Sequence, residues 1–224
     1  RFVSEFGAQA VPTNASFMEP ERWPHLDWKR LGRNHAMQKW IVYRRTPQAD
    51  YPTFEAWQAA TQEYQATLLK HHIETLRRLK YRPTGGFCLF AFADGHPTVS
   101  WSILDHERQR KRGFDAVTDA CRPVIVVADR LPAAVEVGDA LALDLHVVND
   151  LHRPLEHAEV VAQLSWNGGE HRWRFRGTIP ADDCARVGTL QFLVPAGTRS
   201  LVLDLTLEHS EVAVTNRYET FVSI

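Results

Sequence analysis

The order of three segments in the first half of the chain most constrains its fold. A short apolar segment, residues 1–6, is followed by a long helix and then by a continuous apolar run, residues 87–93, after the breakers Pro83 and Gly85. This run predicts a strand buried on both faces, as in a parallel sheet. Strand, long helix and strand in this order are typical of a (β/α) repeat. The helix is predicted from apolar residues at three- and four-residue spacings: Trp57, Ala60, Tyr64, Leu68, Leu69, Ile73, Leu76 and Leu79.

Residues 8–52 lie between the first segment and this helix, and they are rich in Pro, Trp, His and Arg with no sustained period. They predict a long excursion with one short helix around residues 35–40. Loops of this length are usually functional or packed over something. A set of four tryptophans suits either the stacking of a sugar ring or packing, and we expect packing. These are Trp23, Trp28, Trp40 and Trp57.

The second half of the chain has a different pattern, of short segments in which apolar and polar residues alternate. Asn167-Gly168-Gly169 stands between two of them and is a hairpin turn signal. Strands at this spacing over about 100 residues predict a β-sandwich. We therefore expect a domain boundary near residues 120–122. The alternating segments are residues 141–147, 160–166, 171–175, 190–194, 201–207 and 217–222.

Composition argues against several classes of partner. The chain has 26 basic and 27 acidic side chains, so it offers no excess charge for nucleic acid or an anionic membrane. No apolar run approaches the roughly 20 residues of a membrane span. The three cysteines, Cys88, Cys121 and Cys184, fit neither a disulfide framework nor a zinc site. A reducing, cytoplasmic compartment is the expectation, and secretion stays open because a signal segment can lie upstream.

Glu5 is a carboxylate at the end of the first apolar segment. In (β/α)₈ enzymes the reacting groups lie at the carboxyl ends of the barrel strands, because the βα loops gather there. The segment Arg1-Phe2-Val3-Ser4-Glu5-Phe6-Gly7-Ala8-Gln9 resembles the strand 7 motif of family 2 glycoside hydrolases, especially the β-mannosidase and exo-glucosaminidase branch. The resemblance implies that Glu5 is the catalytic nucleophile. An ordinary ion-paired glutamate is the structural alternative.

Two later segments extend the resemblance in family order. The stretch from Asp94 to Asp105, which contains Ser100-Trp101-Ser102, is similar to the one that follows strand 8, and Lys111-Arg112-Gly113-Phe114 is similar to the pair that opens the last barrel helix. The resemblance implies a fold of class α/β plus all-β. Residues 1–120 would form the C-terminal portion of a (β/α)₈ barrel, with strands 7 and 8, and residues 121–224 an immunoglobulin-like β-sandwich.

The sequence departs from the family where the sugar is recognised. The family pattern Trp-Gln-Leu-Asn-Asp is here Phe90-Ala91-Phe92-Ala93-Asp94, so the tryptophan that floors the sugar pocket is replaced by Phe90. Phe90 and Asp94 are candidates for substrate binding, together with His35 and His96. Core packing for Phe90, a turn cap for Asp94 and surface positions for the histidines are the alternatives. No histidine has metal-ligand spacing, so neither a metal nor a cofactor is expected.

The resemblance implies double displacement, in which a second carboxylic acid protonates the leaving oxygen. In the family this acid is the glutamate of an Asn-Glu pair at strand 4, and no Asn-Glu dipeptide occurs in the chain. Two strands cannot close a barrel. We therefore expect a fragment whose partner is the rest of the catalytic barrel upstream. The isolated fragment is expected to lack hydrolase activity and to self-associate through its open edge.

The sequence thus predicts a retaining O-glycosyl hydrolase that acts on a carbohydrate substrate. β-Mannosides are favoured by the branch that the first motif resembles, while β-galactosides, β-glucuronides and exo-glucosaminides stay open. The alternative is a non-catalytic carbohydrate-binding or interaction protein with a degenerate barrel. The changes at Phe90 to Ala93 are the best argument for it.

Overall fold

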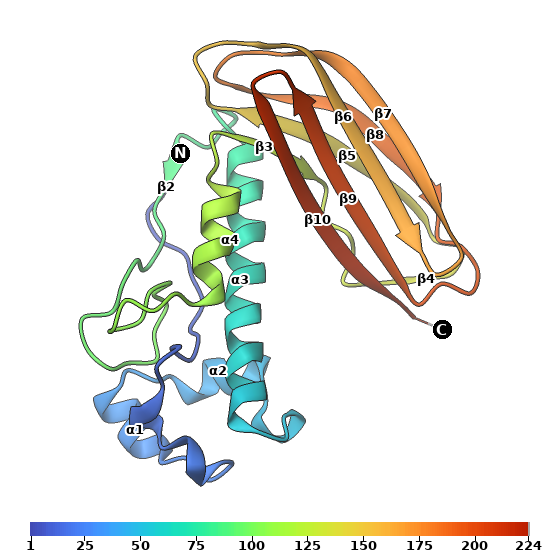
Figure 1. Ribbon diagram of the computed structural model, residues 1–224. Coiled ribbons are helices and arrows are strands. Elements are labelled where there is room, and N and C mark those ends of the chain that lie inside the picture. Colours follow the sequence, from blue (N-terminus) through green and yellow to red (C-terminus); the bar gives the residue numbers. More distant parts are fainter. Residues whose placement is uncertain (224) are drawn as a thin grey trace. The chain divides into compact units, whose positions relative to one another are not determined.

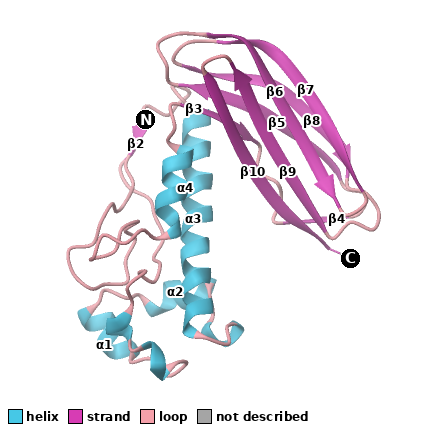
Figure 2. Ribbon diagram, viewed as in Figure 1, coloured by secondary structure: helices cyan, strands magenta, loops and turns pink. Residues whose placement is uncertain are grey.

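The computed structural model describes residues 1–223, and the chain divides into two compact units. Unit 1 comprises residues 1–76 and 81–121, and unit 2 comprises residues 77–80 and the chain from residue 122 onward. The α-helices lie almost wholly in unit 1, and the long strands lie in unit 2 (Figures 1 and 2). None of the helices in residues 1–223 is long and apolar enough to cross a membrane.

Unit 1 is built around one long helix, α3, which confirms the helix predicted from the apolar spacing. Trp57, Leu69 and Ile73 lie on its buried face. The elements of unit 1 are β1 (Phe2–Val3), η1 (Ser16–Met18), η2 (Pro20–Arg22), α1 (Trp28–Asn34), α2 (Lys39–Arg45), η3 (Gln48–Asp50), α3 (Phe54–Arg78, whose last residues belong to unit 2), β2 (Gly86–Phe87) and α4 (Arg112–Ala120).

The excursion between β1 and α3 forms a small core of its own. The prediction of one short helix around residues 35–40 is wrong, because two helices flank this stretch: α1 ends at Asn34 and α2 begins at Lys39. Asp27 accounts for the earlier start of α1, because its side chain accepts a hydrogen bond from the Arg30 backbone nitrogen at 3.0 Å and caps the helix. Most of the tryptophans pack as expected, whereas Trp40 is 68% exposed. The core contains Val11, Ala15, Met18, Leu26, Leu31, Met37, Val42, Phe54, Trp57 and Val99.

The predicted strand at residues 87–93 needs the largest correction among the predicted elements. Strand β2 ends at Phe87, and Phe90 and Phe92 are 47% and 63% exposed rather than buried on both faces. Strands β1 and β2 pair in parallel, and no third strand within residues 1–223 joins them. The later part of the run is hydrogen-bonded to the irregular segment 101–104 rather than to a third strand, and this segment leaves Phe90 and Phe92 largely uncovered.

Unit 2 consists of two sheets that pack around one hydrophobic core, as in a β-sandwich. The five-stranded sheet has the order β4-β10-β9-β6-β7 and the three-stranded sheet the order β3-β5-β8. Alternation places Leu203 of one sheet and Leu145 of the other in the shared core. The strands are β3 (Val124–Ala128), β4 (Ala134–Glu136), β5 (Ala140–Asn149), β6 (Leu155–Trp166), β7 (Gly169–Ile179), β8 (Asp183–Leu193), β9 (Ser200–His209) and β10 (Val212–Ser223).

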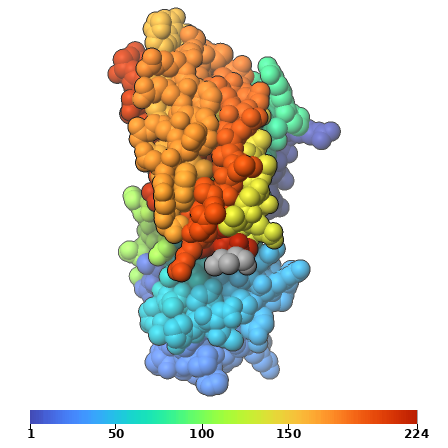
Figure 3. Space-filling view, turned by 90° about the vertical axis from the view of Figure 1, so that its right-hand side faces the viewer, coloured from blue at the N-terminus to red at the C-terminus, as the bar shows by residue number. Residues whose placement is uncertain are grey.

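The predicted hairpin at Asn167-Gly168 is confirmed, because Trp166 of β6 pairs with Gly169 of β7 across this turn. Pairing is antiparallel throughout both sheets except between β4 and β10. On the side seen in Figure 3, the surface of unit 2 is formed mainly by the segments coloured orange, from β6 to β8.

Candidate functional site

Glu5 and Phe90 lie at the same end of two segments that run side by side. The parallel pairing of β1 with β2 is continued by backbone hydrogen bonds on both sides of these short strands. The chain thus brings the end of the first apolar segment next to the end of the second, as expected for consecutive strands of a (β/α) repeat. The additional bonds run from Gly85 N to Arg1 O (2.7 Å), from Cys88 N to Val3 O (2.9 Å) and from Phe90 N to Phe6 O (3.0 Å).

Gly7 makes the close approach of these segments feasible. A Cβ atom at this position would lie 2.2 Å from the Phe90 carbonyl oxygen and 3.4 Å from Cβ of Trp101. Only a residue without a side chain fits at that distance. The glycine of Ser4-Glu5-Phe6-Gly7 therefore serves packing, and it fixes Glu5 relative to Phe90.

The two groups at this end are both accessible to a ligand. Glu5 is solvent-exposed. Phe90 packs one side against Trp101, at 5.8 Å between ring centroids, and the rest of its ring is open. A carboxylate and an exposed aromatic ring at the same end of two paired segments suit a sugar, because the ring can stack on apolar C–H groups while the carboxylate reaches an electrophilic carbon.

Asp94 is held inside the protein. It is 7% exposed, and its two carboxylate oxygens accept hydrogen bonds from the hydroxyl groups of Ser100 and Ser102, each at 2.5 Å. The ammonium group of Lys111 lies 3.8 Å from Oδ2. These contacts favour the turn-forming alternative for Asp94, and its contact with substrate stays a prediction.

The two candidate histidines lie in one neighbourhood, although they are far apart in sequence. The Nδ1 atom of His35 is 2.8 Å from the Pro97 carbonyl oxygen, and Pro97 directly follows His96. The His35 ring also stacks on Phe17 at 4.5 Å and approaches Arg30 at 3.4 Å, so packing occupies much of it. His96 is exposed. Substrate contact by either ring stays a prediction.

Sequence reasoning missed the polar face of α3. The Gln65 amide nitrogen, which is fully buried, donates to the backbone oxygens of Ala8, Trp101 and Ser102 at 2.8, 3.2 and 3.1 Å. Thr61 and Gln62 similarly bond both backbone groups of Val11, at 3.0 Å each. The helix thereby holds the loops that follow Glu5 and Phe90. The one signal in the sequence is that these polar residues share a helical face with Trp57 and Leu69: Gln58, Thr61, Gln62 and Gln65.

Lys111, which the sequence marked only as part of the segment that resembles the start of the last barrel helix, also contacts these loops. It precedes α4 and its side chain is fully buried. Burial lowers its pKa to about 8, because removal from water disfavours the charged form, while the carboxylates of Asp94 and Asp105 act in the opposite direction. The residue therefore titrates close to neutral pH.

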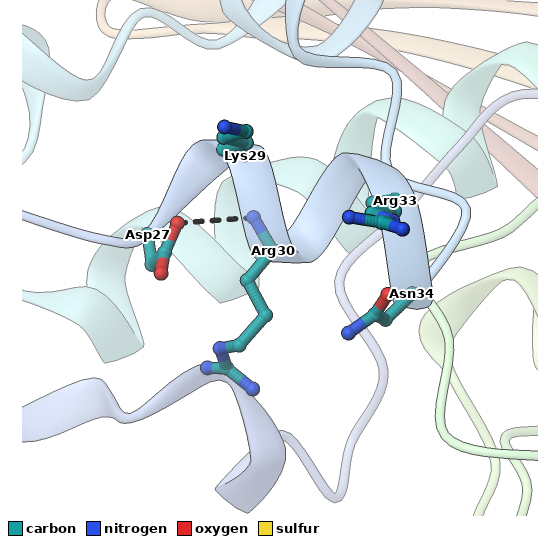
Figure 4. A pocket seen from close by; sticks show the side chains of 5 residues that line it. All are labelled: Asp27, Lys29, Arg30, Arg33 and Asn34. Atoms are coloured by element: carbon teal, nitrogen blue, oxygen red, sulfur yellow. Dashed lines mark hydrogen bonds between the residues drawn. The ribbon is translucent and has the colours of Figure 1, made fainter.

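Two hollows in the surface are lined by other residues than Glu5, Phe90 and Lys111. One, of about 350 Å³, is lined by α1 and the residue before it: Asp27, Lys29, Arg30, Arg33 and Asn34 (Figure 4). Another, of about 390 Å³, lies over the ends of β5 and β8. Neither contains Glu5 or Phe90. No group of three or more His, Cys, Asp or Glu side chains in residues 1–223 has an arrangement that could hold a metal ion.

Comparison with curated proteins gives consistent relatives, although no family model matches the chain. It is similar to β-mannosidase B of Aspergillus terreus, with 27% identity over 230 residues, and to that of Aspergillus niger, with 27% identity over 227 residues. These alignments cover 95% and 94% of this chain but 26% and 25% of the relatives. The chain thus spans about a quarter of the length of the curated relatives it matches.

Solved structures agree with this fold. The β-D-mannosidase of Dictyoglomus thermophilum superposes with a TM-score of 0.76 at 21% identity, over 99% of this chain and 27% of that one. An exo-chitosanase of Amycolatopsis orientalis, solved with PNP-β-D-glucosamine, gives 0.71 at 14% identity over 99% and 27%. The chain is related to the C-terminal part of family 2 glycoside hydrolases. The resemblance read from Ser4-Glu5-Phe6-Gly7 and the later segments is thereby confirmed.

Proposed function

We propose that the protein carrying this chain is a retaining glycoside hydrolase in which Glu5 is the nucleophile. The observation that carries the proposal is the placement of Glu5, which is exposed and lies at the end where two parallel segments joined by α3 finish. Such ends hold the reacting groups of (β/α)₈ enzymes. The relatives are a β-mannosidase B and a β-D-mannosidase, and we therefore propose a β-mannoside as the substrate.

The reaction proceeds by two displacements at the anomeric carbon. The Glu5 carboxylate attacks this carbon and forms a glycosyl ester, while a second carboxylic acid donates its proton to the leaving oxygen. The same second group then takes a proton from water, which attacks the ester, releases the sugar and frees Glu5. The two carboxyl groups must lie about 5–5.5 Å apart, and the second belongs to the rest of the barrel.

Residues 1–120 are then the end of a (β/α)₈ barrel, and residues 121–224 an immunoglobulin-like sandwich. The exposure of two phenylalanines on or next to the paired segments supports this division: Phe2 at 62% and Phe92 at 63%. Large apolar side chains gathered on an open two-stranded sheet form a surface that further strands cover in a closed barrel.

A second candidate is a non-catalytic carbohydrate-binding protein. The replacement of the family's tryptophan by Phe90 and the loss of polar side chains at Ala91 and Ala93 favour it. Such a protein keeps an exposed ring for stacking but does not form a covalent intermediate.

Covalent labelling separates the two candidates. The full-length protein, treated with a panel of fluorosugar inactivators, is expected to gain the mass of one glycosyl group on the peptide that contains Glu5. A fluorosugar traps the ester because the fluorine atom slows its hydrolysis. Label on another carboxylate would overturn the assignment of Glu5, and the absence of label with every sugar would favour the binding protein.

Phe90 is expected to bind the sugar, and Phe92 is not. Because Phe90 is exposed at the same end of the paired segments as Glu5, Phe90→Ala should raise KM for an aryl β-mannoside about ten-fold, which corresponds to ~1.4 kcal/mol. Phe92→Ala is the matched control, since it removes another exposed ring two residues further along the chain, and its KM should change less than about two-fold. A larger effect of Phe92→Ala would contradict this assignment.

A further inference from the structure

The buried ammonium group of Lys111 lies where two loops meet. One loop follows Glu5 and contains Ala10, and the other follows Phe90 and contains Ser100; the Ala10 backbone nitrogen donates to the Ser100 carbonyl oxygen at 3.0 Å. The Lys111 ammonium group reaches both loops at this point. Its distances are 3.3 Å to Ala10 O, 3.4 Å to Ser100 O, 3.1 Å to Ser102 Oγ and 3.8 Å to Asp94 Oδ2.

Asp94 connects this junction to the rest of the second loop. Its carboxylate accepts from Ser100 and Ser102, and its backbone oxygen accepts from the Arg108 guanidinium group at 2.6 Å. The Ser102 hydroxyl group thus lies between Lys111 and Asp94 and contacts both. Lys111, Ser102 and Asp94 thus form one hydrogen-bonded network that contains a positive and a negative charge.

We propose that Lys111 is a positioning residue of the reaction, whose ammonium group, held by Asp94, locks the loop after Glu5 to the loop after Phe90. The inference rests on the proposed function. Lys111 does not touch the reacting atoms. It acts by fixing where the nucleophile stands relative to the sugar-binding ring, and an error of about 1 Å in such a position can cost a factor of roughly 100 in rate.

The charge of Lys111, rather than its bulk, is what the position requires. A buried ammonium group is costly, and an apolar side chain of similar length would fill the space at lower cost. The neutral amide of Gln65 already holds Ala8 and Ser102 from α3. What an ammonium group adds is three donors and an attraction to the two carboxylates that face it, Asp94 and Asp105.

This charge can be titrated, because the pKa of Lys111 is lowered to about 8. Between this value and the ordinary 10.5, the unfolded chain binds more protons than the folded protein. Stability contributed by this group therefore rises with pH in that window. Positioning by the ammonium group is lost over the same window. Above pH about 8 the labelling rate should therefore fall, while the contribution of Lys111 to the free energy of unfolding rises.

The test measures the rate of Glu5 labelling against pH in the full-length protein, with a 2-deoxy-2-fluoroglycosyl fluoride at saturation. The Glu5 carboxylate forms a bond to the anomeric carbon, and fluoride leaves without a proton, so the acid/base group does not enter. In the wild type the rate should fall above pH about 8. Lys111→Arg should move this fall to higher pH, because arginine stays charged. Asp94→Asn should move it to lower pH, because the carboxylate favours the ammonium form.

Lys111→Met should label roughly 10- to 100-fold more slowly and without the fall. Lys29→Met, at an exposed lysine of α1, is the matched control and should follow the wild type. If Lys111→Met does not fold, the proposal is tested by the opposite shifts of the pH profile expected for Lys111→Arg and Asp94→Asn. If Glu5 is labelled and the pH profiles of the wild type and these variants coincide, the role of Lys111 is overturned but the proposed function stands. Absence of labelling in the wild type would overturn the proposed function with it.

Discussion

Replacing Glu5 with glutamine is expected to lower kcat of the full-length protein by about 10⁴-fold or more, with little change in KM. The amide has the shape of the carboxylate but cannot form a bond to the anomeric carbon. Glu5 is exposed, and its backbone is fixed by the pairing of residues 1–6 with residues 85–90, so the substitution should leave the fold intact. Steady-state hydrolysis of an aryl β-mannoside measures the effect.

The matched control is Glu21→Gln, at an exposed glutamate of η2, which should change kcat less than about two-fold. A nucleophile leaves a further trace. Glu5→Gly with added azide should recover turnover, because azide attacks the anomeric carbon in the space left by the side chain, and the glycosyl azide should have inverted configuration. Retention of more than a tenth of the wild-type rate by Glu5→Gln would contradict the assignment.

The position of Glu5 was predictable because several features of the sequence agree on it. The motif marks the residue, and the long helix with an apolar segment on either side predicts a (β/α) repeat. A (β/α) connection brings the second strand next to the first, and the hydrogen bonds from Phe90 to Phe6 and from Cys88 to Val3 meet this expectation.

The burial of residues 87–93 was not predictable from the apolar run alone. Such a run reports that apolar side chains need cover, but it does not say which part of a chain provides it. Within residues 1–223 only β1 pairs with β2, so Phe90 and Phe92 stay largely exposed. The same limit applies to β7, predicted at residues 171–175 and observed at Gly169–Ile179. Most of the side chains near its two ends are exposed and show no alternation.

The polar residues that organise the site were the hardest to see. Gln65 and Lys111 have side chains of the kind that usually face solvent, and polarity alone places such residues on the surface, although Gln65 shares a helical face with Trp57 and Leu69. Both are instead buried, because backbone oxygens in the loops after Glu5 and Phe90 need donors that these loops do not supply themselves. Irregular loops packed against a helix therefore require polar residues on its buried face, and the sequence does not show which loop is packed there.

Gly7→Ala should disrupt the site from a distance. The new Cβ atom would lie 2.2 Å from the Phe90 carbonyl oxygen, a backbone atom that has no rotamer to change. The Phe90 amide nitrogen is bonded to Phe6 at 3.0 Å, so the carbonyl group cannot move without separating the two segments. We expect a loss of about 3 kcal/mol in the free energy of unfolding and a fall in kcat of about 100-fold as Glu5 moves.

Gly95→Ala is the matched control, since nothing lies within 4 Å of the position its Cβ atom would occupy. This variant should keep both the unfolding transition and kcat of the wild type. Thermal unfolding and steady-state kinetics on the two variants separate close packing from a general intolerance of alanine in this region. If Gly7→Ala behaved like Gly95→Ala, Phe90 and Glu5 would not be held together by this contact. The role of Gly7 would then lie outside the packing of the two segments.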